Sequence, residues 1–295
     1  MRLLVTGATG FLGWRTATLL AERGHDVTAT SRPGGRARPF SADLQTVAID
    51  VGDPAVGDLV AGRDAVLHFA GMPDPRRSRE DPARAIRENA GATAVLLDAC
   101  ERHGAGLVYP SSIRAGIEPA PDAYALSKRL GEEACRLHRA DAAIVRLTSI
   151  FGPGQAAWDG ATGAISAFAA RALAGEPIVI PGNPERTRDF LYVDDLVDGL
   201  EALIAAGRWD AEPALAASGS ATALPDAARL VVAALGADVP IETPGGELPA
   251  GEDASYEPDP LAPRIPLTTR PLAESVARYV DWLARYAAAQ GRPQA

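Results

Sequence analysis

Residues 2–13 read RLLVTGATGFLG, and this stretch decides the expected fold. Its apolar run LLV predicts a short buried strand. Gly7, Gly10 and Gly13 follow at intervals of three and open an amphipathic pattern that is typical of a helix. Such a turn lets the backbone approach a pyrophosphate, whose charge meets the helix N-terminus. A second apolar run at residues 25–30 supplies the next strand, so the context favours dinucleotide binding over a purely structural glycine turn.

The end of the second strand indicates which dinucleotide binds. It carries Ser31 and Arg32 and no carboxylate. An acidic residue at this position hydrogen-bonds the adenosine ribose of NAD, whereas a basic residue accommodates the 2′-phosphate of NADP. The sequence therefore predicts that NADP(H) is preferred, with Arg36 as a further phosphate contact, while NAD(H) stays an alternative. The competing interpretation is that Arg32 is a solvated arginine in a loop rich in glycine, proline and arginine.

Two further strand ends are expected beside the cofactor. Residues 46–51 read TVAIDV and predict a strand, whose Asp50 can accept a hydrogen bond from the adenine amino group. Residues 65–70 predict a fourth strand. Because ligands bind at the carboxyl ends of parallel strands in open α/β sheets, the segment that ends this strand is expected at the cofactor.

His68 and Asn89 are polar residues within regular patterns. His68 lies in the fourth apolar run, and we expect a core histidine with its polar atoms satisfied. Asn89 lies in a helix predicted over residues 82–103, where it is either exposed or bridges to the active site through its backbone or water. Residues 72–79, which are rich in proline and arginine, predict a loop.

Tyr124 and Lys128 are the candidate catalytic pair. They lie four residues apart in a predicted helix over residues 123–139, and Lys128 is the only lysine among 295 residues. Residues at this spacing share a helix face, so the ammonium is expected to lower the pKa of Tyr124. Such a tyrosine can exchange a proton with an alcohol oxygen. Ser112, which follows a strand predicted at 106–109, is expected to hydrogen-bond the same oxygen. The alternative is that the pair is an ordinary helix-surface pair and the serine an ordinary turn residue.

The expected contacts to the cofactor combine these segments. They are Gly7, Thr9, Gly10, Phe11, Leu12, Ser31, Arg32, Asp50, Val51, Phe69, Ala70, Gly71, Tyr124 and Lys128.

Composition excludes several function classes. Hydrophobic residues make up 47% of the chain, but no apolar run is long enough to cross a bilayer. The net charge of −9 argues against a general nucleic-acid binder. The first strand begins at once, without signal-peptide features, so we expect a cytoplasmic protein without a membrane partner. Cys100 and Cys135 fall in predicted helices, which suits a reducing compartment, and the four scattered histidines predict no metal site.

Taken together, these motifs resemble the extended short-chain dehydrogenase/reductase family, which contains NAD-dependent nucleotide-sugar epimerases, dehydratases and ketoreductases. The likeness spans nearly the whole chain. Residues 6–13 resemble the TGxxGxxG fingerprint of the family, Asp50 and Val51 its adenine contact, and Ser112, Tyr124 and Lys128 its catalytic set. Residues 146–153 are similar to its RxxNxYGP turn, and residues 182–195 are similar to its GxGxxxRDFxYVxD segment.

The resemblance implies an α/β fold, with a doubly wound parallel Rossmann sheet and a smaller C-terminal α/β substrate lobe. The implied boundaries are 1–148 plus about 188–209 for the Rossmann domain, 149–187 plus about 210–286 for the substrate lobe, and 287–295 for a tail. It also implies a homodimer through the two helices beside the active site. A stripe of Leu126, Leu130 and Leu137 fits that contact.

The resemblance further implies where a substrate binds. Arg188 of the RDF segment is expected to hold a diphosphate, and Ser149 replaces the usual asparagine of the preceding turn. Ser112 and Arg114 complete the expected substrate set. The dehydratase members carry an Asp-Glu pair after the serine or threonine, whereas this chain has Ile113 and Arg114, so dehydration is not expected.

The sequence therefore predicts an NADP(H)-dependent oxidoreductase that reduces a keto group of a sugar, foremost a nucleotide-activated deoxyketosugar, with Tyr124 as the acid/base. A short connection from Ser112 to Tyr124 and the basic end of the second strand favour a ketoreductase. Three alternatives stay open: an NAD-retaining nucleotide-sugar epimerase, a uronate or secondary-alcohol dehydrogenase, and a non-catalytic dinucleotide-sensing protein.

Overall fold

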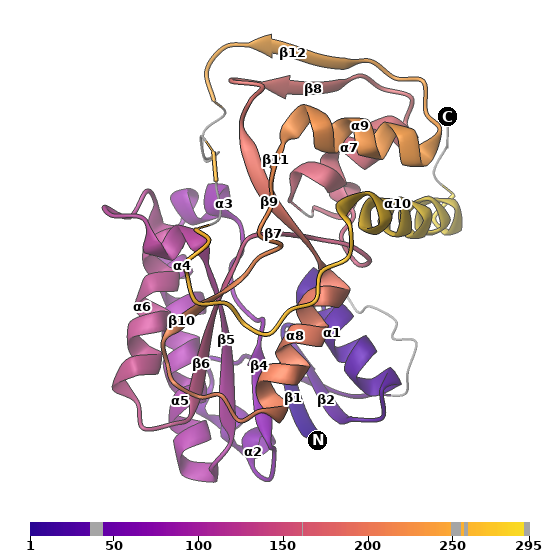
Figure 1. The fold of residues 1–295 in the computed structure, drawn as a ribbon. Helices are drawn as coiled ribbons and strands as arrows, with labels where there is room; N and C mark the ends of the chain where they lie inside the picture. Colours follow the sequence, from indigo (N-terminus) through magenta and orange to yellow (C-terminus); the bar gives the residue numbers. More distant parts are fainter. Residues whose placement is uncertain (36–43, 161, 249–254, 257–258, 292–295) are drawn as a thin grey trace. The chain divides into compact units, whose positions relative to one another are not determined.

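The computed structural model describes residues 1–35, 44–160, 162–248, 255–256 and 259–291. The chain divides into two compact units (Figure 1). The first unit comprises Met1–Leu147, Leu196–Ala216 and Pro263–Leu267. The second unit comprises Thr148–Asp195, Ala217–Ala262 and Thr268–Ala295.

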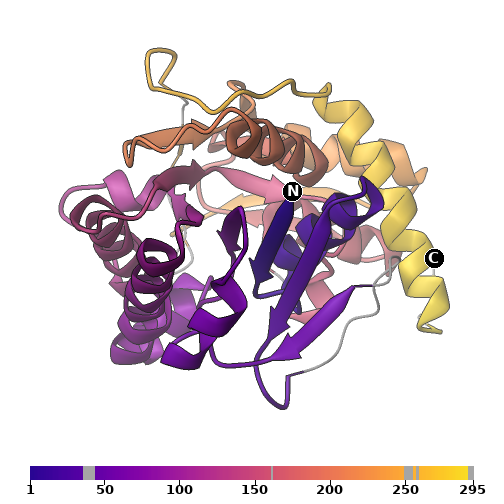
Figure 2. The same cartoon turned by 90° about the horizontal axis from the view of Figure 1, so that it is seen from below.

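Within the described ranges, the first unit is built on a seven-stranded parallel sheet in the order β10-β6-β5-β4-β1-β2-β3. The strands are β1 (Arg2–Thr6), β2 (Asp26–Ser31), β3 (Gln45–Ala48), β4 (Ala65–His68), β5 (Gly106–Ser112), β6 (Ala142–Leu147) and β10 (Pro213–Ala216). Strand order reverses between β1 and β4, which is the arrangement of a doubly wound Rossmann fold. The expected α/β fold is thus confirmed. Figure 2 shows the N-terminal strands, coloured indigo and purple, running side by side in one direction.

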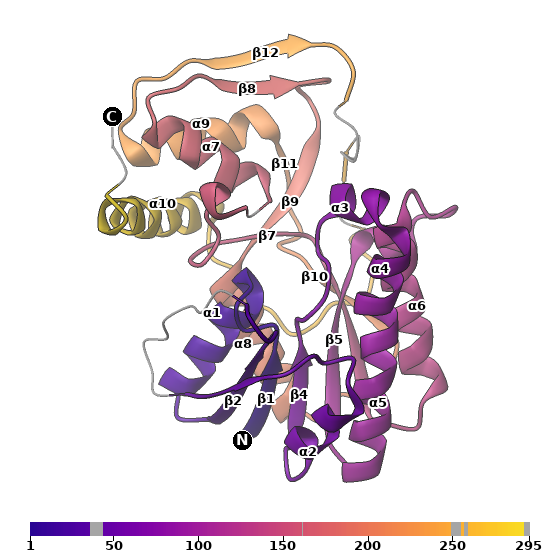
Figure 3. The ribbon, with the colours of Figure 1, turned by 180° about the vertical axis from the view of Figure 1, so that it is seen from behind.

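Helices cover both faces of this sheet. α1 (Phe11–Glu22) and α8 (Val193–Ala205) lie together on one face, whereas α5 (Ala92–His103) and α6 (Ala123–Leu137) lie on the other (Figures 1 and 3). Arg23, which follows α1, pairs with Asp198 of α8 at 2.5 Å between Nη2 and Oδ1. This ion pair ties the end of α1 to α8 on that face of the sheet.

The helix predicted over residues 82–103 is interrupted by a π-helical turn. α4 (Pro82–Ile86) leads into η2 (Arg87–Gly91), and α5 continues from there. The preceding segment, predicted to be a loop, contains α3 (Pro75–Glu80). That helix forms because Asp74 Oδ1 accepts a hydrogen bond from the Arg76 nitrogen at 2.8 Å and proline occupies the first helical position.

Apolar side chains fill the space between this sheet and the helices. The buried members include Leu4, Val66, Leu96, Leu107 and Ile144, none of which is more than 1% exposed. Parallel strands are covered on both faces, which explains why β4 and β5 are buried along their whole length. In the described part of the chain, no helix is both long and apolar enough to span a membrane.

The second unit holds a three-stranded and a two-stranded sheet in its described residues. The first consists of β7 (Ser149–Phe151), β9 (Thr187–Tyr192) and β11 (Ala221–Ala223), and the second of β8 (Ile178–Pro181) and β12 (Ile241–Gly245). Its helices are α7 (Ala164–Leu173), α9 (Leu224–Leu235) and α10 (Leu272–Ala289).

Aromatic side chains form part of the second core. Phe151 packs against Phe190, Tyr192 and Tyr279, with ring centroids 5.7–6.3 Å apart. Tyr279 is fully buried, and its hydroxyl donates to the Gln155 carbonyl oxygen at 2.6 Å. Tyr279 therefore belongs to the core of the second unit.

Three boundaries differ from the expected ones. β9 pairs with β7 and β11 in the second unit, although residues 188–209 were expected in the Rossmann domain. The reason is that its aromatic side chains bury in the second core. β10, expected in the substrate lobe, instead extends the large sheet by pairing with β6. α10 continues to Ala289, past the expected start of a tail at residue 287.

Candidate active site

The glycine turn joins β1 to α1 against the end of β4. Gly7 has a φ of +70°, and a Cβ there would lie 2.6 Å from the Ala70 nitrogen. A Cβ on Gly13 would lie 2.4 Å from the Gly7 carbonyl oxygen, so the helix approaches the turn closely. The N-cap of α1 is Gly10, and the first turn carries no acidic residue. No side chain caps the first N–H groups of this helix, so they can donate to a bound anion such as a pyrophosphate.

Hydrogen bonds fix the end of β4 beside this turn. The Thr6 hydroxyl accepts from the Ala70 nitrogen at 3.1 Å and lies 2.9 Å from Nδ1 of His68. His68 is fully buried, and burial, with a smaller effect of Lys128, lowers its pKa to about 3. The ring is therefore neutral at physiological pH and supports the strand end. His68 lies in the core as expected, but its buried Nε2 has no hydrogen-bond partner among the described residues, so the expectation of satisfied polar atoms is met at Nδ1 alone.

The end of β2 carries a contact that sequence reasoning missed. The Arg32 guanidinium pairs with Glu88 of η2 at 3.2 Å, and Ser31 is half-buried beside it. Arg36 lies outside the described residues. A sequence signal for Glu88 was absent, because 56 residues separate the two partners.

Asp50 lies beyond its strand, because β3 ends at Ala48. Its carboxylate accepts from the Gly52 nitrogen at 2.9 Å, and Val51 is buried. The predicted strand over residues 46–51 is thus shorter at its end. The adenine contact of Asp50 stays a prediction.

Ser112 and Tyr124 are brought together. Ser112 is the last residue of β5, and Tyr124 lies in the first turn of α6, where the Ser112 side chain is close enough to act on the pKa of the phenol. Asp122 sets the start of α6, because its Oδ1 accepts from the Ala125 nitrogen at 2.9 Å. The two hydroxyl groups expected at one carbonyl oxygen are therefore neighbours in the first unit.

The electrostatics of Tyr124 differ from the expectation. Burial raises its pKa above the ordinary value, Ser112 and Arg114 act in the lowering direction, and Asp122 raises it. Lys128 has no such lowering effect: its Nζ donates to the Pro110 carbonyl oxygen at 2.8 Å and lies 5.0 Å from the centre of the Tyr109 ring. Burial lowers the pKa of Lys128 to about 8, against an opposing effect of Glu132. Helix spacing predicts that Tyr124 and Lys128 share a face, but burial is the largest influence on the pKa of each residue.

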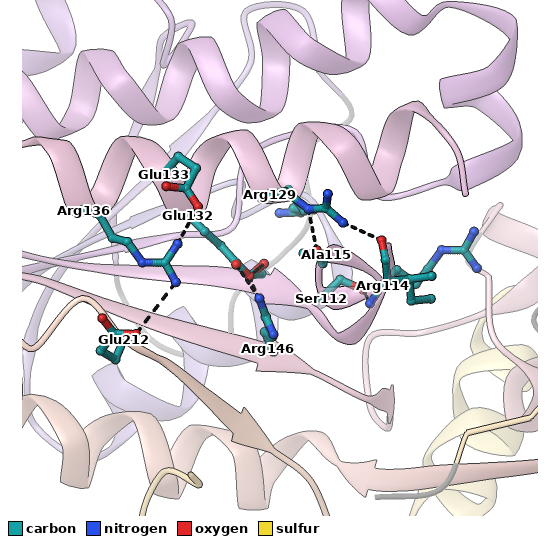
Figure 4. Close-up of polar contacts among 12 residues, drawn as sticks. Ser112, Arg114, Ala115, Arg129, Glu132, Glu133, Arg136, Arg146 and Glu212 are labelled. Atoms are coloured by element: carbon teal, nitrogen blue, oxygen red, sulfur yellow. Dashed lines mark hydrogen bonds and ion pairs between the residues drawn. The ribbon is translucent and has the colours of Figure 1, made fainter. Parts of the chain in front are cut away.

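Arginines tie the connection between Ser112 and Tyr124 to α6. Arg129 Nε donates to the Ala115 carbonyl oxygen at 2.8 Å, and its other nitrogens contact Ile117 and Glu118 (Figure 4). Arg114 is buried, and its Nη2 donates to Asp122 Oδ2 at 2.5 Å. The segment that follows the serine is therefore held by the helix that carries the tyrosine.

An ion pair between a buried carboxylate and a partly buried guanidinium links α6 to β6. Glu132 of α6 accepts from Arg146 of β6, with Nε to Oε1 at 2.8 Å and Nη2 to Oε2 at 2.7 Å (Figure 4). Ser111 donates to the same carboxylate at 2.5 Å. Sequence reasoning missed Glu132, although it lies four residues after Lys128 and hence on the same helix face.

Asn89 links the end of β4 to α6. Its Oδ1 accepts from the Met72 nitrogen at 2.7 Å, and its Nδ2 donates to the Met72 carbonyl oxygen at 3.1 Å and to Ser127 Oγ at 2.8 Å. Ser127 in turn donates to the Tyr124 carbonyl oxygen at 2.8 Å. Asn89 is buried by the π-helical turn and bridges to the catalytic helix through its side chain.

Ser149 and Arg188, the other expected substrate residues, belong to the second unit. Arg188 Nη1 donates to the Thr187 carbonyl oxygen at 2.7 Å. Its neighbour Asp189 is fully buried and accepts from Thr148 Oγ1 at 3.0 Å and from the nitrogens of residues 218–220 at 2.7–3.2 Å. The acid of the RDF segment is thus a loop anchor, a role that the motif alone did not predict.

The described residues contain no group of three or more histidine, cysteine or acidic side chains placed to hold a metal ion. Cys100 and Cys135 are free and buried, and burial raises the pKa of each thiol to about 12. Both thiols are therefore protonated at physiological pH.

Comparisons with known proteins agree with this geometry. The sequence profile of the NAD dependent epimerase/dehydratase family matches residues 3–213. The dTDP-4-dehydro-6-deoxy-D-allose reductase of Streptomyces bikiniensis is 30% identical over 314 residues, covering 91% of this chain and 95% of that protein. UDP-glucuronic acid decarboxylase 1 of Xenopus tropicalis is 28% identical over 69% of this chain, which spans about half of that relative's length (53%). The solved structure of MoeE5 in complex with UDP-glucuronic acid and NAD has a TM-score of 0.80 and 26% identity, covering 97% of this chain and 100% of that one.

Proposed function

The chain belongs to the NAD-dependent epimerase/dehydratase family, and from this premise we propose that it is an NADP(H)-dependent reductase of a keto group on a nucleotide-activated sugar. The observation that carries the proposal is the placement of Tyr124, in the first turn of α6, beside Ser112 at the end of β5. This pair lies in the same unit as the glycine turn, at the carboxyl edge of a parallel sheet, where such folds bind ligands.

The residues of the first unit fit a dinucleotide. The first turn of α1 would hold the pyrophosphate, because its N–H groups and helix dipole favour an anion and a side chain at Gly7 would clash with the end of β4. Ser31 and Arg32 would hold the 2′-phosphate, and Lys128 would donate to the nicotinamide ribose. When bound, the nicotinamide supplies the hydride that reduces the carbonyl carbon.

Tyr124 holds the proton that the carbonyl oxygen needs. Because burial raises its pKa, the phenol stays protonated at physiological pH and is ready to act as an acid. The Ser112 hydroxyl is placed to donate to the same oxygen and to stabilise its developing negative charge. The protonated phenol is the form that a carbonyl reduction uses.

The second unit would supply contacts to the sugar nucleotide. Arg188 would bind its diphosphate and Ser149 would contact the sugar, while Arg114 of the first unit would contribute a further sugar contact. The similarity to the dTDP-4-dehydro-6-deoxy-D-allose reductase of Streptomyces bikiniensis supports this class of substrate.

A homodimer contact is proposed on α6 of the first unit. Leu126, Leu130 and Leu137 are 38%, 39% and 82% exposed there, and we propose that they pack against a second copy of the chain.

An epimerase that retains NAD is the second candidate. It is favoured by one observation, the carboxylate of Glu88 beside Arg32, because an acidic group at this position can accept a hydrogen bond from the ribose of NAD. An epimerase regenerates its dinucleotide within each cycle and consumes none.

The test begins by denaturing freshly purified protein and identifying any released dinucleotide by mass spectrometry. The stripped protein is then titrated with NADPH and NADH and assayed with nucleotide-activated ketosugars. The proposal expects no retained NAD, tighter binding of NADPH, and one alcohol product for each NADPH consumed. Stoichiometric retained NAD with sugar epimers as products would establish the epimerase instead.

A further inference from the structure

An ion pair joins the end of β2 to the π-helical turn η2. Arg32 Nη1 lies 3.2 Å from Oε1 of Glu88. The same oxygen accepts from Arg84 Nε of α4 at 2.6 Å. One carboxylate oxygen is therefore shared by two guanidinium groups that come from different elements.

The backbone at Glu88 is fixed in place. Its neighbour Asn89 is buried and makes two hydrogen bonds to Met72, which follows β4, and one to Ser127 of α6. π-helical turns recur at functional sites, where they direct side chains differently from a regular helix. The turn thus holds the carboxylate of Glu88 at the end of β2 rather than leaving it on a freely solvated helix face.

The end of β2 is the position at which dinucleotide folds read the adenosine ribose. β2 itself carries no acid there, but the fold brings one from η2. Arg32 and Arg84 contribute two positive charges, and Glu88 reduces the sum to one. A 2′-phosphate carries nearly two negative charges, so Arg32 attracts it while Glu88 repels it. A 2′-hydroxyl meets no such repulsion and can donate to a carboxylate.

We propose that Glu88 is a specificity-determining residue for the dinucleotide, because its pairing with Arg32 weakens the preference for NADP(H) over NAD(H). This inference rests on the proposed function, in which Arg32 contacts the 2′-phosphate. It implies that the native chain binds both dinucleotides and discriminates between them only modestly.

The experiment compares dissociation constants for NADPH and NADH in the full chain and in Glu88→Gln, by calorimetry at low ionic strength. Removing one charge a few ångströms from a dianion should shift the ratio of the two constants toward NADPH by about tenfold. The shift should shrink as salt is added. Glu133→Gln is the matched control, because Glu133 also pairs with an arginine, at 2.6 Å, but on the exposed face of α6. It should leave the ratio unchanged.

A double-mutant cycle tests whether Glu88 acts through Arg32. In the Arg32→Gln background, Glu88→Gln should shift the ratio by clearly less than in the native background, since only the direct repulsion between Glu88 and the phosphate is left and the paired cation is gone. An equal shift in both backgrounds would show that Glu88 acts independently of Arg32 and would overturn the proposal. Glu88→Asp keeps the charge and should stay within about threefold of the native ratio, which separates charge from packing at the turn.

The outcomes separate this inference from the proposed function. A native chain that binds neither dinucleotide overturns both. A native chain that binds NADPH, together with a folded Glu88→Gln variant whose ratio is unchanged, overturns the inference alone. Folding of each variant is checked by its thermal midpoint. If Glu88→Gln does not fold, Glu88→Ala and the Arg84→Gln variant take its place, and Arg84→Gln should shift the ratio toward NADH.

Discussion

The two units of the chain use a buried carboxylate in different ways. In the first unit, Glu132 accepts from the side chains of Arg146 and Ser111 and fixes two strands against the catalytic helix. In the second unit, Asp189 accepts mainly from backbone nitrogens of residues 218–220 and fixes a loop. The difference shows how each unit holds its site. The proton-transfer residues stand on regular elements locked by an ion pair, whereas the expected substrate contacts stand on short strands whose loops need an anchor.

The largest expected effect separates chemistry from binding. Tyr124→Phe should lower turnover by about a thousandfold or more, because the acid that protonates the carbonyl oxygen is lost. Dissociation constants for the dinucleotide should stay within about twofold, and stopped-flow and calorimetry measure the two quantities. Tyr286→Phe in the second unit, whose hydroxyl donates to Asp159, is the matched control. Substantial turnover in Tyr124→Phe would contradict the role of Tyr124 as the acid that protonates the carbonyl oxygen.

The next-largest effect is expected when the Glu132 carboxylate, which anchors α6 to two strands of the first unit, is removed. Glu132→Ala should lower the free energy of unfolding by about 3–5 kcal/mol, because the partly buried Arg146 guanidinium loses its partner. Urea denaturation followed by circular dichroism measures it. Glu133→Ala, whose salt bridge is exposed, should cost no more than about 0.5 kcal/mol. Equal costs for the two variants would show that the buried pair has no special weight.

A smaller effect is expected from the anchor of the second unit. Asp189→Asn should destabilise the chain by about 2 kcal/mol, since either carboxylate oxygen accepts from two donors and an amide nitrogen cannot replace it. The KM for the sugar nucleotide should rise while the dinucleotide affinity stays unchanged. Asp226→Asn, on the exposed face of α9, is the control. A loss of dinucleotide affinity in Asp189→Asn would contradict the division of roles between the units.

The smallest effect concerns Lys128 and pH. Its pKa of about 8 lies below the ordinary 10.5, so the folded chain releases this proton first. Dinucleotide affinity should fall a few-fold as pH rises through about 8, because a positive charge near an anionic ligand is lost. Over pH 8 to 10.5 this group should make the free energy of unfolding rise, since only the unfolded state keeps the proton. Lys128→Gln should remove both trends, and a native affinity that is flat across this range would contradict the placement of the ammonium.

The regular parts of the first unit could be predicted from the sequence because they depend on short-range patterns. β4 and α6 begin at the predicted residues, 65 and 123, and Ser112 lies beside Tyr124. Contacts between distant segments could not be predicted in this way. The pairing of Arg32 with Glu88 spans 56 residues, and the placement of β9 depends on which core its aromatic residues join.

The direction of the Tyr124 pKa was also beyond the sequence. Spacing along a helix shows which residues share a face, but the cost of burying a phenolate depends on the surrounding tertiary structure. The hydrogen bond from Lys128 to the Pro110 carbonyl oxygen is likewise a tertiary contact, which spacing along the helix does not predict.

The central claim is tested most directly by single-turnover reduction of a nucleotide-activated ketosugar with NADPH, in the native chain and in Tyr124→Phe. NADPH oxidation is followed by absorbance, and the product by nuclear magnetic resonance. The predicted result is one alcohol formed for each NADPH oxidised in the native chain and none in the variant. Sugar epimers formed without net NADPH oxidation, or equal reduction by both proteins, would contradict the claim.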